Sequence, residues 1–167
     1  FTMCEDKLKG KTYNLSEGLS ILGETLLDDI GGSMGPLYGM LFDEMAMACE
    51  DAEEIDAEVF GEMVTNAVEG LQEISPAKVG DKSLIDTLVP AKEAFIAAKE
   101  EGKEFAQCLE AMNEAAEKGW QSTKDLVAKI GRASRLGERS RGVLDAGATS
   151  CYFIVTGIGK AAIGLLK

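Results

Sequence analysis

The chain has 167 residues, 46% of them hydrophobic and 28% charged, which suits one compact globular core and excludes a disordered or fibrous protein. Its 29 acidic and 17 basic residues give a net charge of −12, which would repel nucleic acid and anionic membranes. There is no histidine, which excludes a phosphohistidine carrier within this stretch, and the four widely spaced cysteines indicate reduced, mostly buried thiols of a cytosolic protein.

Apolar residues three and four positions apart predict helices along the whole chain. Residues 2–8 look like the end of a helix already under way, so we expect further residues upstream of Phe1. Amphipathic helices are then expected near residues 15–30, 37–48, 57–74, 83–99, 104–119, 120–128 and 149–166. Short connections force neighbouring helices to bury their apolar faces against each other, which predicts an all-α antiparallel bundle or barrel.

No signal peptide is visible, and the longest strongly apolar run, residues 151–158, is far shorter than the ~20 residues of a membrane-spanning helix. We therefore expect a soluble protein in the cytoplasm.

The segment GGSMGP at residues 31–36 ends one predicted helix and opens the next. Glycine allows a left-handed turn and a close approach of an anion, serine is a good N-cap, and the free N–H groups of a helix start attract phosphate. The alternative is a tight corner that needs glycine for helix packing. The candidate phosphate-binding residues are Gly31, Gly32, Ser33, Met34 and Gly35.

All four arginines of the chain lie inside the glycine-rich segment 131–150, in the ten consecutive positions 132–141. The thirteen lysines are spread elsewhere. The arginines are Arg132, Arg135, Arg139 and Arg141. A planar guanidinium matches phosphate in a fixed geometry, so this segregation indicates a phosphate site. The alternative is a surface hairpin that pairs with the acidic bulk, and Glu138 is expected to pair with one of the four.

Two shorter segments complete the set of candidates. Asp145, Ala146 and Gly147 form a turn into the last helix, capped by Thr149 or Ser150, and either line an adenine or ribose pocket or serve only as a turn. Residues 80–83, with an acidic residue at position 86, have the spacing of a capping box, which explains them without a ligand.

Together these segments resemble the L subunit of bacterial dihydroxyacetone kinase, or the nucleotide domain of the one-chain kinases. The resemblance rests on GGSMGPLYG at 31–39, GDKSLIDTLVP at 80–90 and GRASRLGERSRGVLDAGATS at 131–150, which cover nearly the full chain in the expected order.

The resemblance implies a single nucleotide-binding domain over residues 1–167, an eight-helix antiparallel barrel whose first helix is missing here. The phosphates would lie over residues 31–35, with Arg132 as the catalytic phosphate-side arginine, Leu84 against adenine, and Asp145, Ala146 and Gly147 as the nearby turn. The family usually has proline where this chain has Ala146, and a small polar residue where it has Met34, which offers only its backbone N–H.

The resemblance also implies ADP or ATP as the nucleotide and two Mg²⁺ ions, whose acidic loop is expected upstream of Phe1. The acceptor, dihydroxyacetone or a similar short ketose, would be bound by a histidine of a partner K subunit. Retained ADP would be rephosphorylated by a phosphotransferase-system protein, the M subunit. An ATP-dependent kinase and a non-catalytic helical interaction module are the alternatives. Every version of the kinase requires the arginines and the glycine corner to face each other across one pocket.

Overall fold

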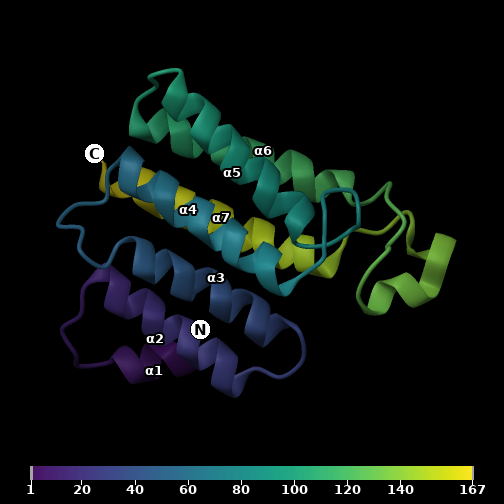
Figure 1. Cartoon of the computed structure of the whole chain (residues 1–167), viewed down its shortest axis with the longest axis horizontal. Helices are drawn as coiled ribbons and strands as arrows, with labels where there is room; N and C mark the ends of the chain where they lie inside the picture. The colour runs from purple at the N-terminus through teal and green to yellow at the C-terminus, as the bar shows by residue number, and fades with distance from the viewer. Residues whose placement is uncertain (1, 167) are drawn as a thin grey trace. The chain divides into compact units, whose positions relative to one another are not determined.

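A computed structural model describes residues 2–166 of the chain. Within this range the chain forms seven α-helices, one 3-10 helix and no strand, so the predicted all-α class is confirmed (Figure 1). The structure divides between Pro76 and Ala77 into two compact units, which are described in turn.

The first unit contains α1 (Thr2–Leu8), α2 (Leu15–Asp29), α3 (Met34–Ala48) and α4 (Ala57–Ile74). Each of these helices packs against the next one along the chain. Asn14 and Glu17 form a reciprocal capping box at the start of α2, and the carboxylate of Asp56 caps α4. These caps and the apolar spacing account for the agreement between the predicted and observed helices in this unit.

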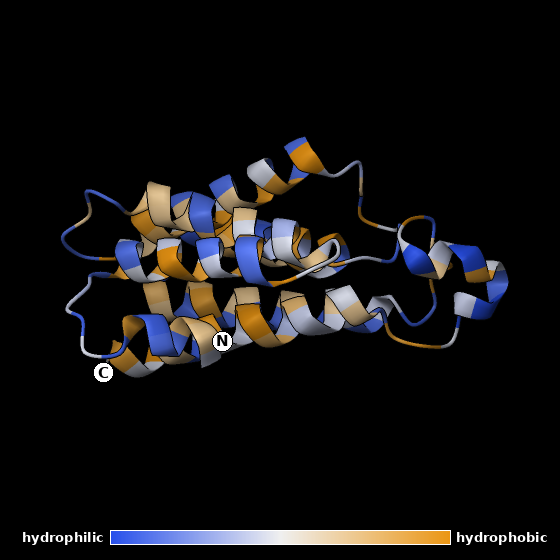
Figure 2. Ribbon diagram, turned by 90° about the horizontal axis from the view of Figure 1, so that it is seen from below, coloured by the Kyte–Doolittle hydropathy of each residue, from blue (hydrophilic) through white to orange (hydrophobic). Residues whose placement is uncertain are grey.

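The second unit contains α5 (Ile85–Glu100), α6 (Phe105–Ser122), the 3-10 helix η1 (Arg132–Ser140) and α7 (Ala146–Leu165). The helices α5, α6 and α7 pack against one another, and Phe95, Leu109 and Cys151 are fully buried. Figures 1 and 2 show the largely hydrophilic η1 lying beyond the ends of these three helices. The polar segment is therefore held at one end of this unit, outside its core.

The predicted break between helices 104–119 and 120–128 is wrong. One helix, α6, continues through Gly119 and Trp120 to Ser122, and residues 123–126 form turns. Gly119 is buried against α5, where an added Cβ would overlap the carbonyl oxygen of Asp86. The glycine thus permits two helices to approach closely, which is a different use from the helix end that the sequence suggested.

All four cysteines are free and buried, as predicted. Within residues 2–166, α7 is the one helix that could cross a membrane by length and composition. Mostly buried core helices also meet this criterion, whereas 28% of the apolar stretch of α7 is buried; within its unit α7 packs on α5 and α6.

Candidate functional site

The glycine corner of the first unit joins α2 to α3. Ile30 ends α2 in an extended conformation, and Gly32 has a φ of +80°, which side chains other than glycine rarely adopt. Gly35 is buried, and an added Cβ there would lie 2.6 Å from the carbonyl oxygen of Leu26 and closer still to that of Ile30. Close packing of the chain therefore explains why glycine occupies position 35. This agrees with the alternative interpretation of the segment as a tight corner that needs glycine for helix packing.

The start of α3 nevertheless has the properties of an anion site. Among residues 2–166, the backbone N–H groups of Ser33, Met34 and Gly35 donate no hydrogen bond. An added Cβ at Gly31 or Gly32 would meet no atom within 4 Å, and residues 31–33 are exposed, so the turn that precedes these N–H groups is open to solvent. Because the positive end of the helix dipole lies behind them, they can receive a phosphate group.

Ser33 occupies the N-cap position of α3, but its side chain makes no capping hydrogen bond. Its backbone is in the αR region (φ −79°, ψ −15°), whereas a capping serine is normally extended. The expected serine cap is therefore absent, and no capping bond occupies its hydroxyl.

In the second unit, the turn before α7 lies against the start of α5. An added Cβ on Gly147 would lie 3.4 Å from the backbone nitrogen and 3.7 Å from the Cβ of Leu84. Leu84 is only 5% exposed, so it offers little side-chain surface to an adenine ring, whereas the neighbouring Ala146 is exposed. The structure thus brings together Leu84, Asp145 and Gly147, which the sequence placed in one nucleotide pocket.

The cap of α7 differs from the prediction. Asp145, and neither Thr149 nor Ser150, is the N-cap residue, and its Oδ2 accepts from the backbone N–H of Ala148 at 2.8 Å. The hydroxyl of Thr149 instead donates to the Asp145 carbonyl and accepts from the indole of Trp120. Burial raises the pKa of Asp145, and the N–H groups of Ala148 and Gly147 oppose that rise.

Residues 132–140 of the arginine segment form two short 3-10 turns that meet at a kink at Gly137 (φ +54°, ψ −132°), within the loop between α6 and α7. Arg141 pairs with Glu138 (Nε to Oε2, 3.1 Å) and donates to the carbonyl oxygen of Asp125, so the expected pairing of Glu138 with an arginine is confirmed. Arg132, Arg135 and Arg139 are exposed and have no hydrogen-bond or ion-pair partner among residues 2–166. One arginine therefore has a structural contact, and three are available to an anion.

The capping interpretation of residues 80–86 is confirmed in part: Leu84, rather than Ser83, occupies the N-cap position of α5 and makes no side-chain capping bond, but Ser83 and Asp86 do bond the backbone at this helix start. The backbone N–H of Ser83 donates to Oδ2 of Asp86 at 2.7 Å, and the Ser83 hydroxyl accepts from the backbone of Ile85 at 3.2 Å. Oδ1 of Asp86 also accepts from the backbone N–H of Gly80 at 2.6 Å.

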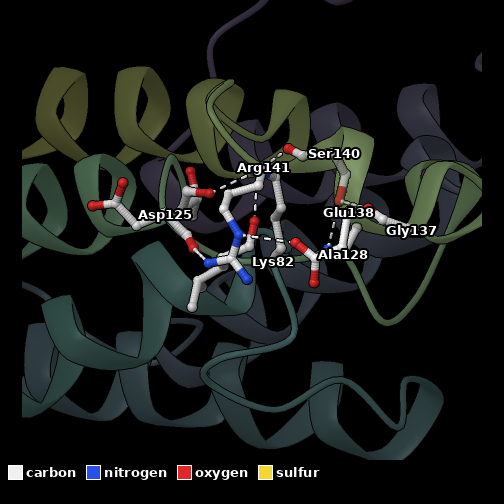
Figure 3. A network of polar contacts seen from close by, with 9 residues as sticks. Lys82, Asp125, Ala128, Gly137, Glu138, Ser140 and Arg141 are labelled. Carbon is white, nitrogen blue, oxygen red and sulfur yellow. Dashed lines mark hydrogen bonds and ion pairs between the residues drawn. The ribbon is translucent and has the colours of Figure 1, made fainter.

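Sequence reasoning missed Lys82, which lies within this capping segment. Its side chain is buried, and its ammonium group donates to carbonyl oxygens on both sides of the arginine segment, as Figure 3 shows in part. The only signal in the sequence is a lysine beside an acidic turn residue, and such a pair suggests an exposed ion pair instead. Asp81 does form that pair, but with Lys129 at 3.2 Å.

A hollow in the first unit lies elsewhere, between α1 and the first half of α2. It has a volume of about 810 Å³ and includes Leu8, Tyr13 and Leu19 in its lining but none of the predicted site residues. No group of three or more acidic or cysteine side chains that could hold a metal ion is found among residues 2–166. No step of the chemistry is therefore assigned to a metal held by these residues.

The predicted nucleotide-binding residues are divided between the two units. Residues 31–35 belong to the first unit, whereas Leu84, Arg132 and residues 145–147 belong to the second. That the glycine corner and the arginines share one pocket stays a prediction.

The DAK2 domain model matches residues 1–160 of the chain. The ADP-binding subunit DhaL of the PEP-dependent dihydroxyacetone kinase of Escherichia coli (strain K12) is 37% identical over 84% of this chain and 67% of its own length. The corresponding subunit of kinase 1 of Listeria innocua is 36% identical over 82% of this chain and 63% of its length. The chain thus spans about two thirds of these relatives.

L-Erythrulose kinase of Pectobacterium atrosepticum is 30% identical over 78% of this chain and 22% of its length. The crystal structure of the dihydroxyacetone kinase of C. freundii (native form) matches with a TM-score of 0.63 and 23% identity, over 89% of this chain and 24% of that one, which supports the helical fold. Because the domain model and the DhaL relatives cover most of its sequence, the chain belongs to the DAK2 domain family, as a subunit of the DhaL type.

Proposed function

We propose that this chain is the ADP-binding subunit of a cytoplasmic dihydroxyacetone-type kinase and transfers a phosphoryl group to a short ketose. The observation that carries the proposal is the row of three unpaired backbone N–H groups at the start of α3, behind an open glycine turn. Such a site binds phosphate without a cationic side chain. The names of the relatives specify ADP, a nucleoside diphosphate, as the ligand that they bind.

Each segment has a distinct part in the proposed reaction. The N–H groups of residues 33–35 hold the phosphates, and the turn at residues 145–147 lines the adenine side, with the buried Leu84 packed beneath it. The Arg132 side chain is exposed and has no partner among residues 2–166, so its guanidinium can neutralise charge on the transferred phosphoryl group. Bound ADP would supply the phosphate that accepts and passes on the phosphoryl group.

The ketose must be held by another chain or domain in this proposal. This sequence has no histidine that could bind a ketone covalently. We therefore propose a ketose-binding K subunit as one partner and a phosphotransferase-system protein, the M subunit, as the phosphoryl donor. Relatives named as PEP-dependent and PTS-dependent kinases support this route. Magnesium is proposed from the family resemblance alone, because no metal-binding group was found in residues 2–166.

Nucleotide analysis of the purified full-length protein tests the proposal. We expect mass spectrometry under native conditions to find about one ADP per chain, retained through gel filtration in magnesium buffer. Freely exchanging ATP would instead indicate the ATP-dependent kinase. No copurifying nucleotide, together with no binding of added ADP and Mg²⁺ by calorimetry, would contradict the proposal and indicate a non-catalytic module.

A further inference from the structure

The ammonium group of Lys82 lies in a cage of backbone carbonyl oxygens. Nζ donates to Thr123 at 2.7 Å, Leu126 at 3.1 Å, Ser140 at 2.6 Å and Val143 at 2.7 Å. The residue is only 3% exposed, and no carboxylate pairs with it among residues 2–166. Asp145 is near enough for the charge of Lys82 to oppose the rise that burial causes in the pKa of that carboxyl, but the direct bonds of the ammonium group are to these carbonyl dipoles, so the cage and the lysine must form together.

The four carbonyls come from both flanks of the arginine segment. Thr123 and Leu126 follow the end of α6, whereas Ser140 ends η1 and Val143 lies beyond it. Two further bonds join the same flanks: the Ala128 N–H donates to the Ser140 hydroxyl at 2.9 Å, and the Gly142 N–H donates to the Lys124 carbonyl at 2.7 Å. Figure 3 shows Lys82, Ala128 and Ser140 within this network. Lys82 therefore closes the base of the loop that carries Arg132.

Backbone and side-chain hydrogen bonds, rather than apolar packing, hold the base of the arginine segment, including the bond from Arg141 to the Asp125 carbonyl and that from the Lys129 N–H to the Asp81 carbonyl. Ser140 is the only buried residue of η1, and Leu136 is 46% exposed, so apolar packing contributes little. Clustered guanidinium groups also repel one another. Moreover, Lys82 has a φ of +65°, a conformation that is unfavourable for lysine and that persists only when its surroundings enforce it.

We propose that Lys82 is a positioning residue that fixes the base of the 127–143 loop and thereby the placement of Arg132 during phosphoryl transfer. This inference rests on the proposed function for its effect on turnover, but its effect on the loop can be measured independently. Lys82 touches no nucleotide in this proposal. It acts through the backbone that it holds.

The test compares Lys82→Met with Lys129→Met in the full-length protein. Methionine keeps the unbranched length but removes the charge and all four hydrogen bonds. Lys129 is a matched control because it is near the same segment, is 63% exposed and pairs only with Asp81. Amide hydrogen exchange is measured at Ala128 and Gly142, ADP affinity by calorimetry, and turnover with the ketose-binding partner.

For Lys82→Met we expect exchange at both amides to rise about tenfold or more, because the loop opens locally. Turnover should fall ~10²-fold, since a displacement of about 1 Å is enough for such a loss, while ADP affinity should fall no further than it does in Arg132→Ala. Lys129→Met should alter none of the three. In Lys82→Ala, added n-propylammonium, which replaces the missing part of the side chain, should restore protection and turnover, whereas n-propanol should not.

Unchanged exchange at Ala128 and Gly142 in Lys82→Met would overturn the inference, and so would faster exchange with full turnover. Loss of the helical circular dichroism of both Lys82 variants would also overturn it, because the lysine would then support the whole fold rather than the loop. Failure of the wild-type protein to bind ADP is a separate result: it would contradict the proposed function, whereas the exchange data would still report on the loop.

Discussion

The four clustered arginines differ in their surroundings, so their replacement should have different effects. Arg132 is exposed and unpaired, and Arg135 shares both properties three residues further on. For Arg132→Ala we expect turnover to fall about 10²–10³-fold, as on losing a donor to a developing charge, with an unfolding free energy within about 0.5 kcal/mol of wild type.

Steady-state kinetics with the partner subunit and urea denaturation measure the two quantities for Arg132→Ala. Arg135→Ala is the matched control and should retain most of the turnover. Equal losses in the two variants would indicate that the segment acts through its overall charge rather than through Arg132.

The buried thiol of Cys151 predicts a particular dependence of stability on pH. Full burial raises its pKa to about 12, whereas the thiol of the unfolded chain ionises near its ordinary value. The stabilisation from the neutral buried thiol is thus complete below the unfolded pKa and is lost as pH rises from about 9 toward 12.

Cys151→Ala removes this dependence. It should be less stable than wild type at pH 8 because it leaves a cavity, and the difference should shrink above pH 9 by at most about 1.4 kcal/mol per pH unit. Urea denaturation at pH 8 and pH 10 measures the difference. A constant difference would show that the thiol ionises equally in both states.

Lys82 also shows where sequence reasoning stops at the scale of a residue. The capping roles of Ser83 and Asp86 were predictable because partner and cap lie three positions apart. The partners of Lys82 are carbonyl groups 41 to 61 positions away, and every residue type has a carbonyl. No side-chain pattern could therefore have revealed the cage.

At the scale of a helix, glycine has opposite consequences at two sites. In α6, an added Cβ at Gly119 would overlap the backbone of α5, whereas in α7 an added Cβ at Gly157 would meet nothing within 4 Å. We expect Gly119→Ala to lower the unfolding free energy by about 1–3 kcal/mol through overpacking. Gly157→Ala should raise it by up to about 1 kcal/mol through helix propensity.

Chemical denaturation measures the unfolding free energies of the two glycine variants. Circular dichroism at 222 nm verifies that both keep their helix content. Stabilisation by both substitutions would mean that α5 and α6 separate at little cost and that the close approach at Gly119 is not required.

The helices themselves were largely predictable, whereas their ends were less so. Caps such as Asn14 and Asp56 act within a few residues, so the sequence contains the whole signal. The false break at Gly119 arose because the sequence does not distinguish a glycine that permits a close helix contact from a glycine that ends a helix. The start of α7 was placed three residues late because Asp145, rather than Thr149, provides the cap.

Across the whole molecule, the all-α class followed from apolar spacing that persists over most of the chain, and the structure confirms it. The shared pocket stays a prediction, because residues 31–35 lie in one compact unit and Arg132 in the other. Local patterns do not contain that information. Evidence for the pocket must therefore come from a ligand that contacts both segments at once.

ADP provides such evidence through hydrogen exchange. If one nucleotide bridges the two segments, ADP with Mg²⁺ should slow exchange both at residues 33–37 and at residues 131–141, and at a concentration of 100 Kd it should stabilise the protein by about 2.7 kcal/mol.

Arg132→Ala should weaken protection at residues 33–37, and Gly31→Ala should weaken it at residues 131–141, because each segment then loses the ligand that the other helps to hold. Gly157→Ala, whose added methyl group also meets open space but lies outside both segments, should leave both protections unchanged. Protection confined to one segment, or variants that affect only their own segment, would show that the glycine corner and the arginines do not bind the same nucleotide.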